Sequence, residues 1–170
     1  MATIIDRLHD LTPSHVEGLL ADSEHLGSRI VRRLLEDWGN GTNRFDRSGE
    51  ALFGAWIDGQ LVGVCGLNVD PYAGDDRVGR VRHLYVLSAY RRLGVGRALV
   101  AHVIQAARGR FDDLRLRTTN PAAARLYETF GFRACTKPGD TTHVAELASR
   151  LPNASRASEG VPFPPSERLR

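Results

Sequence analysis

Hydrophobic and polar positions divide the first part of the chain into one short strand and two helices. Residues 3–8 predict a strand, and Thr12-Pro13-Ser14 predicts the first turn of a helix that runs to about residue 23. The segment 26–38 predicts a second helix, because its apolar residues recur every four positions. Two glycines follow at 39 and 41 and indicate where this helix ends.

The middle of the chain changes to the two-residue period of β-strands. Apolar runs at 51–57 and 61–69 are joined by Asp58-Gly59, which predicts a β-hairpin. A polar loop over 70–79 leads to a further strand at about 80–87. The pattern therefore predicts a β-hairpin followed by a third strand.

The last part of the chain alternates between helix and strand. A helix is predicted at 95–108 and a half-buried strand at 114–118. Asn120-Pro121 opens another helix, which ends at Gly131. The segments 132–135 and 142–147 predict a closing hairpin. This order of elements is typical of an α+β domain.

Composition and charge indicate one domain followed by a tail. The 170 residues are 42% hydrophobic, enough for a single full core, which we assign to 1–148. Residues 149–170 are rich in Pro, Ser and Arg and predict a mobile tail. The tail holds four arginines against two acids and so carries +2 of the net charge of +3. The nearly neutral remainder argues against a nucleic-acid partner.

The two cysteines and the N-terminal residues suggest the compartment. Cys65 and Cys135 both lie in apolar runs and are interpreted as reduced core cysteines rather than a disulfide or a nucleophile. The first residues become charged too early for a signal peptide, and no apolar run reaches the ~20 residues of a membrane span. We therefore expect a cytoplasmic protein without a membrane partner.

Glycine and arginine meet where the strand at 80–87 passes into the helix at 95–108. The start of a helix presents free backbone N–H groups and a partial positive charge, which attract phosphate. Gly94 and Gly96 let a ligand approach the backbone, and arginine adds permanent charge. These residues favour a diphosphate ligand. The alternative is a simple glycine turn with solvated arginines.

Two familiar phosphate motifs do not match this junction. A P-loop ends in Gly-Lys-Ser/Thr, whereas Gly96 is followed by Arg97-Ala98. A dinucleotide fingerprint needs a third glycine or alanine where this chain has Leu99. The sequence therefore supports neither a nucleotide hydrolase nor a dehydrogenase.

Two segments together resemble the GCN5-related N-acetyltransferase (GNAT) family. Arg91-Arg92-Leu93-Gly94-Val95-Gly96 is similar to the family's Q/R-x-x-G-x-G/A signature. Asn120 to Phe132 is similar to its N-x-x-A-x-x-L-Y-x-x-x-G-F segment. The resemblance implies a mixed sheet of six to seven strands flanked by about four helices. It also implies acetyl-CoA as cosubstrate, no metal, and direct acetyl transfer to a primary amine of a small molecule, peptide or protein.

The resemblance also implies which residues bind the cosubstrate. The phosphate loop and helix start would hold the pyrophosphate, a backbone N–H near the end of the preceding strand would meet the thioester oxygen, and the second motif would border the pantetheine arm. The residues so assigned are Tyr85, Val86, Arg91, Arg92, Leu93, Gly94, Val95, Gly96, Arg97, Ala98, Asn120, Ala123 and Tyr127.

Tyr127 and His83 are the candidate catalytic residues. Tyr127 aligns with the family tyrosine that protonates the departing thiolate, although its helical face also suits a core aromatic. Many members carry a glutamate shortly before the Leu84-Tyr85-Val86 run, but no acid lies there in this chain. His83 could act as the base instead, or be an ordinary strand histidine. Weaker candidates are His143, Asp70, Asp75 and Asp76, and a dedicated base is not required for an amine with a lowered pKa.

The acceptor and the oligomeric state are left open by the motifs. The expected acceptor pocket offers acidic and aromatic residues that suit a cationic amine: Trp38, Asp70, Tyr72, Asp75 and Asp76. His102 is expected to be exposed on its helix. The alternative function is a non-catalytic acyl-CoA-binding module of the same fold, and a homodimer is a further expectation from the resemblance.

Overall fold

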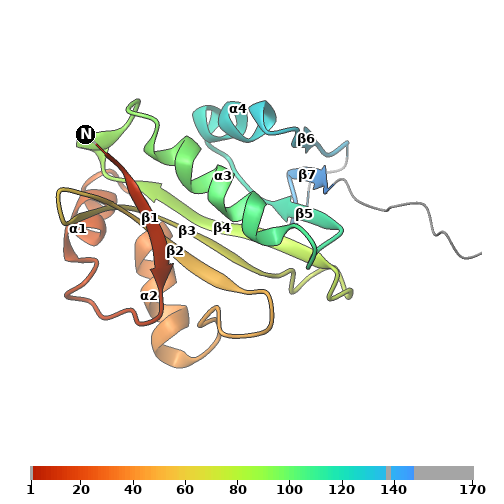
Figure 1. The fold of residues 1–170 in the computed structure, drawn as a ribbon, viewed down its shortest axis with the longest axis horizontal. Coiled ribbons are helices and arrows are strands. Elements are labelled where there is room, and N and C mark those ends of the chain that lie inside the picture. The colour runs from red at the N-terminus through yellow and green to blue at the C-terminus, as the bar shows by residue number, and fades with distance from the viewer. Residues whose placement is uncertain (1, 137–138, 148–170) are drawn as a thin grey trace, which may run out of the picture.

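A seven-stranded mixed sheet forms the centre of the protein (Figure 1). The structure is a computed structural model that describes residues 2–136 and 139–147, so the tail predicted at 149–170 lies outside the described residues. The strand order is β1-β2-β3-β4-β5-β7-β6. The elements are β1 (Ile4–Leu8), α1 (Glu17–His25), α2 (Ile30–Asn40), β2 (Ala51–Ile57), β3 (Gln60–Val69), β4 (Val78–Val86), the 3₁₀ turn η1 (Ser88–Tyr90), α3 (Val95–Ala107), β5 (Asp113–Leu116), α4 (Pro121–Thr129), β6 (Arg133–Ala134) and β7 (His143–Glu146).

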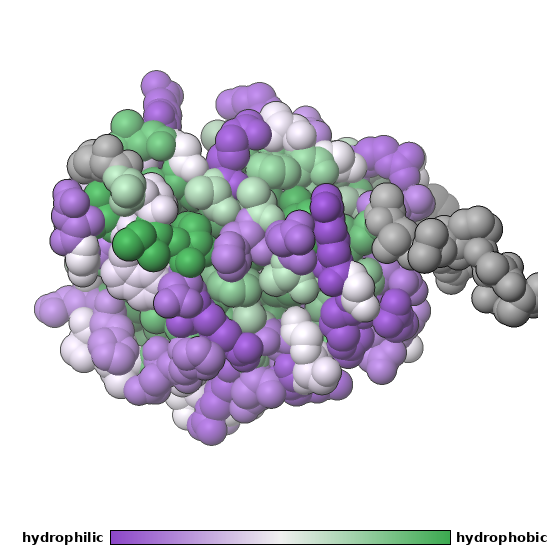
Figure 2. All heavy atoms as spheres, in the orientation of Figure 1, coloured by the Kyte–Doolittle hydropathy of each residue, from purple (hydrophilic) through white to green (hydrophobic). Residues whose placement is uncertain are grey.

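Helices cover both faces of the sheet. Gly63 and Gly66 lie three positions apart on β3 and therefore face opposite sides. Gly63 faces Leu99 of α3, whereas Gly66 faces Phe45, which follows α2. Hydrophilic side chains dominate the rim of the face shown in Figure 2, and apolar side chains are exposed between them. The central strands β2 and β3 are buried almost throughout, as their nearly continuous apolar sequences require.

The sheet opens between β4 and β5, its one parallel pair among the described strands. Their pairing consists of Val78 with Asp113, Gly79 with Leu114 and Arg80 with Arg115. Strand β4 continues to Val86 beyond the last of these pairs. The two strands therefore diverge like a wedge after Arg80, and this gap positions the site described below.

Strand β4 also contains an irregularity inside this wedge. The pairing with β3 shifts register between Val64 and Gly66, where three steps on β4 oppose two on β3. His83 lies at this shift with a φ of 57°, a left-handed value that is uncommon for residues other than glycine. The pattern is that of a β-bulge, which redirects backbone and side chains locally.

The structure confirms most predicted elements and corrects the starts of the first two helices. The hairpin of β2 and β3 and the α4 cap at Asn120 are as expected. Thr12 and Ser14 contact each other's hydroxyl groups at 2.9 Å instead of capping a helix, and α1 begins only at Glu17. Helix α2 begins at Ile30 rather than 26, because Gly27 interrupts the chain with a φ of 74°.

The cysteines differ in their surroundings. Cys65 is a buried free thiol, as predicted, and burial raises its pKa to about 12. Cys135 is only half-buried and is not the core residue that the sequence suggested. His102 is exposed, as expected, with its ring edge-on to Phe53. Within the described part of the chain, no helix combines the length and apolar character needed to cross a membrane.

Candidate active site

A cavity of about 450 Å³ occupies the wedge between β4 and β5. Its walls come from four parts of the fold: the start of α2, residues 80–84 of β4, residues 117–119 after β5, and the first two turns of α4. Tyr72 and Asp140, from two loops, complete the lining. The cavity therefore forms where the parallel pairing stops, and not on a closed surface of the sheet.

Helix α4 contributes three of the predicted site residues to this cavity: Asn120, Ala123 and Tyr127. The side chain of Asn120 accepts hydrogen bonds from the N–H groups of Ala122 at 2.9 Å and Ala123 at 3.4 Å. Asn120 is thus the N-cap of α4, and Pro121 suits the first helical position because it has no N–H to lose. The cap fixes the direction in which α4 enters the cavity wall.

Tyr127 is buried at the cavity wall, with its ring edge-on to Phe132 at a centroid distance of 5.5 Å. Burial raises the pKa of the Tyr127 phenol well above 10, and the neighbouring Cys65 adds to this shift. The phenol is therefore protonated at neutral pH. Tyr127 is therefore packed in the core and also borders the cavity, and its role as a proton donor stays a prediction.

His83 lines the same cavity from β4, next to the bulge. Burial lowers the pKa of its imidazole to about 3, and the positive charges of Arg82 and Arg33 act in the same direction. The ring is therefore neutral at pH 7 and is a weaker base than the sequence-based expectation assumed. A hydrogen bond to the backbone of Ile30 supports the ring, while Nε2 is buried without a partner among the described residues. A neutral imidazole held in this way offers one free acceptor nitrogen.

The end of β4 presents backbone groups toward the wedge. The N–H of Leu87 donates to the carbonyl of Val62 on the β3 side. Because these directions alternate along a strand, the N–H and C=O of Val86 point to the opposite, open edge. Consistently, the Val86 carbonyl accepts from Nε of Arg91 at 3.0 Å rather than from β3.

The loop between β4 and α3 has the backbone conformation of a helix start with exposed amides. Arg92 and Gly94 have φ values of 64° and 84°, and α3 begins at Val95. The first intrahelical bond runs from Ala98 N–H to Gly94 C=O at 3.0 Å, so the amides before Ala98 precede the helical ladder. A Cβ at Gly94 would have no neighbour within 4 Å, which leaves this point open to an approaching ligand.

The arginines of this loop differ in their contacts. Arg91 folds back over the Tyr85 ring at 5.3 Å, and Arg97 lies over Phe130 at 5.3 Å. Arg92 is exposed and has no polar partner in the described ranges 2–136 and 139–147. The loop residues 91–98 do not line the cavity. The predicted site residues therefore fall into two groups: one around the wedge and one at the start of α3.

Asp22 is a residue that the sequence analysis missed. From α1, its carboxylate accepts from the Tyr85 hydroxyl at 2.6 Å and from the N–H and hydroxyl of Ser88 at 3.0 and 2.6 Å. These hydrogen bonds join α1 to the end of β4 and the beginning of the loop. No local signal marks this role, because the partners are more than 60 residues apart.

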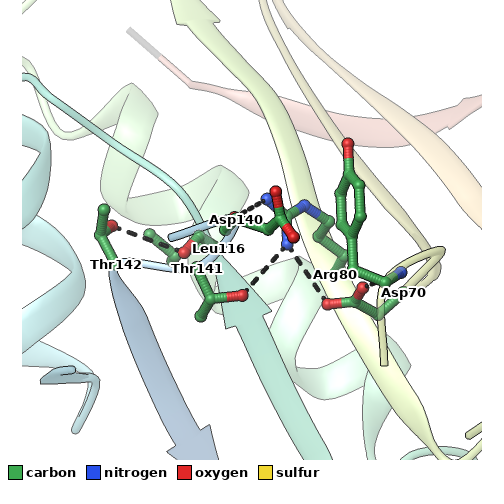
Figure 3. A network of polar contacts seen from close by, with 7 residues as sticks. Asp70, Arg80, Leu116, Asp140, Thr141 and Thr142 are labelled. Carbon is green, nitrogen blue, oxygen red and sulfur yellow. Dashed lines mark hydrogen bonds and ion pairs between the residues drawn. The ribbon is translucent and has the colours of Figure 1, made fainter. Parts of the chain in front are cut away.

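Most of the residues expected at the acceptor pocket do not line this cavity. Of the five residues named for it, only Tyr72 lines the cavity. Asp70 is buried in an ion pair with Arg80 at 3.3 Å, and Arg80 also donates to Thr141 and to the carbonyl of Asp140 (Figure 3). The weaker base candidate His143 is held instead by Thr142 and Glu128, and it is not part of the cavity wall.

Arginine, rather than acid, dominates the charge of the cavity. Among the residues that the structure describes, its lining includes five arginines and a single acid, Asp140. The arginines are Arg29 just before α2, Arg33 in α2, Arg80 and Arg82 from β4, and Arg117 after β5. The alternation of Arg80 and Arg82 on one strand face was visible in the sequence, but their convergence with α2 was not.

Comparison with known proteins identifies the class to which this fold and site belong. The model of the acetyltransferase (GNAT) family matches residues 17–132, which is more than half of the chain. The chain therefore belongs to the GNAT family. At the level of the family, the prediction of an acyltransferase is confirmed.

Two curated relatives extend this match. N-alpha-acetyltransferase RimI of Mycobacterium tuberculosis is 38% identical over 87 residues, which cover 47% of this chain and only 50% of RimI. The uncharacterized N-acetyltransferase YsnE of Bacillus subtilis is 29% identical over 135 residues, covering 76% of this chain and 85% of YsnE.

Solved structures show the same fold. A candidate acetyltransferase from Exiguobacterium sp. 255-15 is 29% identical, has a TM-score of 0.76, and covers 86% of this chain and 94% of its own. YncA from Salmonella typhimurium, solved with its cofactor acetyl-CoA, is 17% identical with a TM-score of 0.65 and covers 91% and 99% of the two chains. The predicted GNAT-type fold is thereby confirmed.

Proposed function

We propose that this protein is an N-acetyltransferase that transfers the acetyl group of acetyl-CoA to a primary amine directly, in a ternary complex. The observation that carries the proposal is a pair of neighbouring features. The backbone edge at Val86 is open toward the wedge, and the helix start that follows is open and carries Arg92, which has no polar partner among the described residues. A long ligand with a diphosphate at one end and a reactive group at the other suits this arrangement.

The chain's residues fit acetyl-CoA at both ends. The amides of Val95, Gly96 and Arg97, with Arg92, would hold the diphosphate, because helix N-termini and arginine bind phosphate oxygens. Leu93 and Gly94 belong to the same loop and Ala98 to the first turn of α3, while Arg91 packs over the Tyr85 ring beside them. Asn120 and Ala123 would border the pantetheine arm from α4. Bound acetyl-CoA supplies an acetyl thioester, an acyl group with a good leaving thiolate.

Three groups of the chain would then serve the transfer. The Val86 N–H, at the open edge of β4, would donate to the thioester oxygen as negative charge develops there. Tyr127, whose raised pKa keeps it protonated, would give its phenolic proton to the departing thiolate. His83 would accept a hydrogen bond from the amine through its free Nε2 and orient the nitrogen lone pair.

His83 has a limited role in this proposal because its pKa is near 3. It cannot deprotonate an ammonium ion efficiently, so the amine must enter in its neutral form. Once the nitrogen bonds to the acyl carbon its N–H becomes acidic, and a weak base is then sufficient. Two free cysteines and the need for acetyl-CoA are consistent with action in the cytoplasm.

Calorimetric titration with acetyl-CoA and CoA tests the binding half of the proposal. Arg92→Gln should raise the Kd for both at least about tenfold, because it removes a charge-assisted contact to phosphate. Arg108→Gln, at the other end of α3, also removes one positive charge but should leave the Kd for acetyl-CoA and CoA unchanged. Equal affinity in all three proteins would contradict the assignment of the phosphate site.

Release of free thiol from acetyl-CoA in the presence of amines tests the chemical half. Tyr127→Phe should lower kcat by about 100-fold with an unchanged Kd for CoA, since it removes a proton donor and keeps the packed ring. Binding of acetyl-CoA without thiol release from any amine would favour the second candidate, a non-catalytic acyl-CoA-binding module. This candidate is supported by the absence of a glutamate on β4 shortly before Leu84, where many family members carry one.

A further inference from the structure

The charge of the wedge cavity is only partly balanced by the protein itself. Arg29 pairs with Glu36 at 3.5 Å, and Arg80 pairs with Asp70 at 3.3 Å. Arg33, Arg82 and Arg117, the other arginines of the cavity wall, form no ion pair with any described residue. Among the described residues, the cavity wall thus carries an excess of positive charge that its single acid, Asp140, leaves uncompensated.

Arg82 is the arginine for which this arrangement is least favourable. It is half-buried on β4, on the same strand face as Arg80, and it hydrogen-bonds to no side chain or carbonyl among the described residues. Burial lowers the pKa of its guanidinium, and the charges of Arg80 and Arg33 lower it further, while Tyr72 and Asp37 act in the opposite direction. Burying an unpaired cation beside like charges costs folding free energy. A ligand of opposite charge would remove that cost.

The phosphates of CoA do not account for these arginines. The phosphate loop at 91–98 has its own arginines and contributes no residue to the cavity wall. The cavity is bordered instead by His83 and Tyr127, which are assigned to the transfer itself, and by Asn120, which is assigned to the pantetheine arm. The positive charge therefore lies where the acceptor must bind.

Resting on the proposed function, we infer that the acceptor is a small primary amine that also carries an anionic group, and that Arg82 and Arg33 bind this group. A guanidinium group offers a planar fork of N–H donors that matches a carboxylate or a phosphonate. The cavity volume of about 450 Å³ lies near the lower end of small-molecule sites. The amine and the anion must both fit inside it, so the acceptor resembles an amino acid or aminophosphonate in size. Thr118 and Thr119 add neutral polar groups to the same wall.

Matched acceptor pairs test this inference in the thiol-release assay. Each pair consists of an L-amino acid and its carboxamide, which share the amine and differ in the anion. An aminoalkylphosphonate separates phosphonate from carboxylate recognition, and an n-alkylamine and a diamine represent acceptors without an anion. We expect kcat/KM to be at least tenfold higher for the acid or the phosphonate than for its uncharged counterpart.

Two variants and a neighbouring control connect this preference to the cavity. Arg82→Gln and Arg33→Gln should each raise the KM for the anionic acceptor at least tenfold and leave the Kd for CoA unchanged. Arg32→Gln, one position along α2 and paired with Glu24 outside the cavity, should change neither. Without ligand, Arg82→Gln should melt at the same or a higher temperature than the wild type, so loss of fold cannot explain its KM.

Each contrary outcome is distinct. Equal rates for acid and carboxamide would overturn the inference and leave the transferase proposal intact. A higher Kd for CoA in Arg82→Gln and Arg33→Gln would assign these arginines to the cosubstrate and also overturn the inference. Binding of acetyl-CoA with no thiol release from any member of the panel would overturn the proposed function, and the acceptor inference with it.

Discussion

The carboxylate of Asp22 accepts a hydrogen bond from the hydroxyl of Tyr85 at 2.6 Å. It also accepts from the N–H and hydroxyl of Ser88, and these contacts with Ser88 and Tyr85 hold the pKa of Asp22 below its ordinary value. One side chain of α1 therefore fixes the end of β4 and the beginning of the phosphate loop.

Asp22→Ala should loosen that junction. The substitution leaves the Tyr85 hydroxyl and two donors of Ser88 without their acceptor, so we expect the free energy of unfolding to fall by about 2 kcal/mol. Urea denaturation measures this change, and calorimetry should show weaker binding of acetyl-CoA. Glu24→Ala, on the same helix in an exposed pair with Arg32, should cost less than about 1 kcal/mol. Equal losses in the two variants would contradict the special role of Asp22.

The same contact should appear in the pH dependence of stability. The pKa of Asp22 is lower in the folded protein than its ordinary 3.8, so the ionised form stabilises the fold above that value. This contribution disappears as the pH falls through the folded pKa. The difference in melting temperature between the wild type and Asp22→Asn should therefore shrink as the pH decreases from about 6 to about 3. A difference that stays constant over this range would argue that the charge of Asp22 is unimportant.

Removing Asp70 should be among the most destabilising single changes. The side chains of Asp70 and Arg80 are 0% and 7% exposed, so Asp70→Ala leaves a buried cation without its partner. We expect a loss of about 3–5 kcal/mol in the free energy of unfolding, measured with denaturant. The exposed pair of Arg133 and Glu146, 3.8 Å apart, is the control, and Glu146→Ala should cost less than about 1 kcal/mol. A small loss for Asp70→Ala would mean that Thr141 and the Asp140 carbonyl satisfy Arg80 alone.

Gly94→Ala should lower the stability of the protein and weaken its binding of acetyl-CoA. The φ of 84° is unfavourable for any residue with a Cβ, at a cost of about 1–2 kcal/mol, although no atom lies within 4 Å to clash with it. Gly39→Ala also meets no atom within 4 Å but lies in α2 without a positive φ, and should stabilise by up to about 1 kcal/mol. Thermal denaturation compares the two variants. Similar shifts in both would mean that the loop relaxes around Gly94.

Features with a local cause were predictable from the sequence. The β2–β3 hairpin follows from two apolar runs around Asp58-Gly59, and the α4 cap follows from Asn120 before Pro121. The positive φ of Gly94 likewise agrees with its choice as a ligand-facing position. In each case the residues that determine the feature lie within a few positions of one another.

Features that depend on distant contacts were not predictable. Asp22 and Tyr85 meet only because α1 packs beside β3 and near the end of β4. Asp70 was expected at the acceptor pocket but is buried against Arg80. The arginine cavity requires α2, β4 and the end of β5 to converge, and neither hydrophobic period nor motif spacing reports that convergence.

The wedge between β4 and β5 also bears on how the protein resists aggregation. Unpaired strand edges invite pairing with strands of other molecules, and β4 has such an edge beyond Arg80. Here the bulge at His83 breaks the regular ladder, and Arg82 and Arg117 place charge on either side of the gap. A foreign strand would have to bury both charges and straighten the bulge before it could pair. The residues that prepare the cavity for a ligand thus also protect an open sheet edge from self-association.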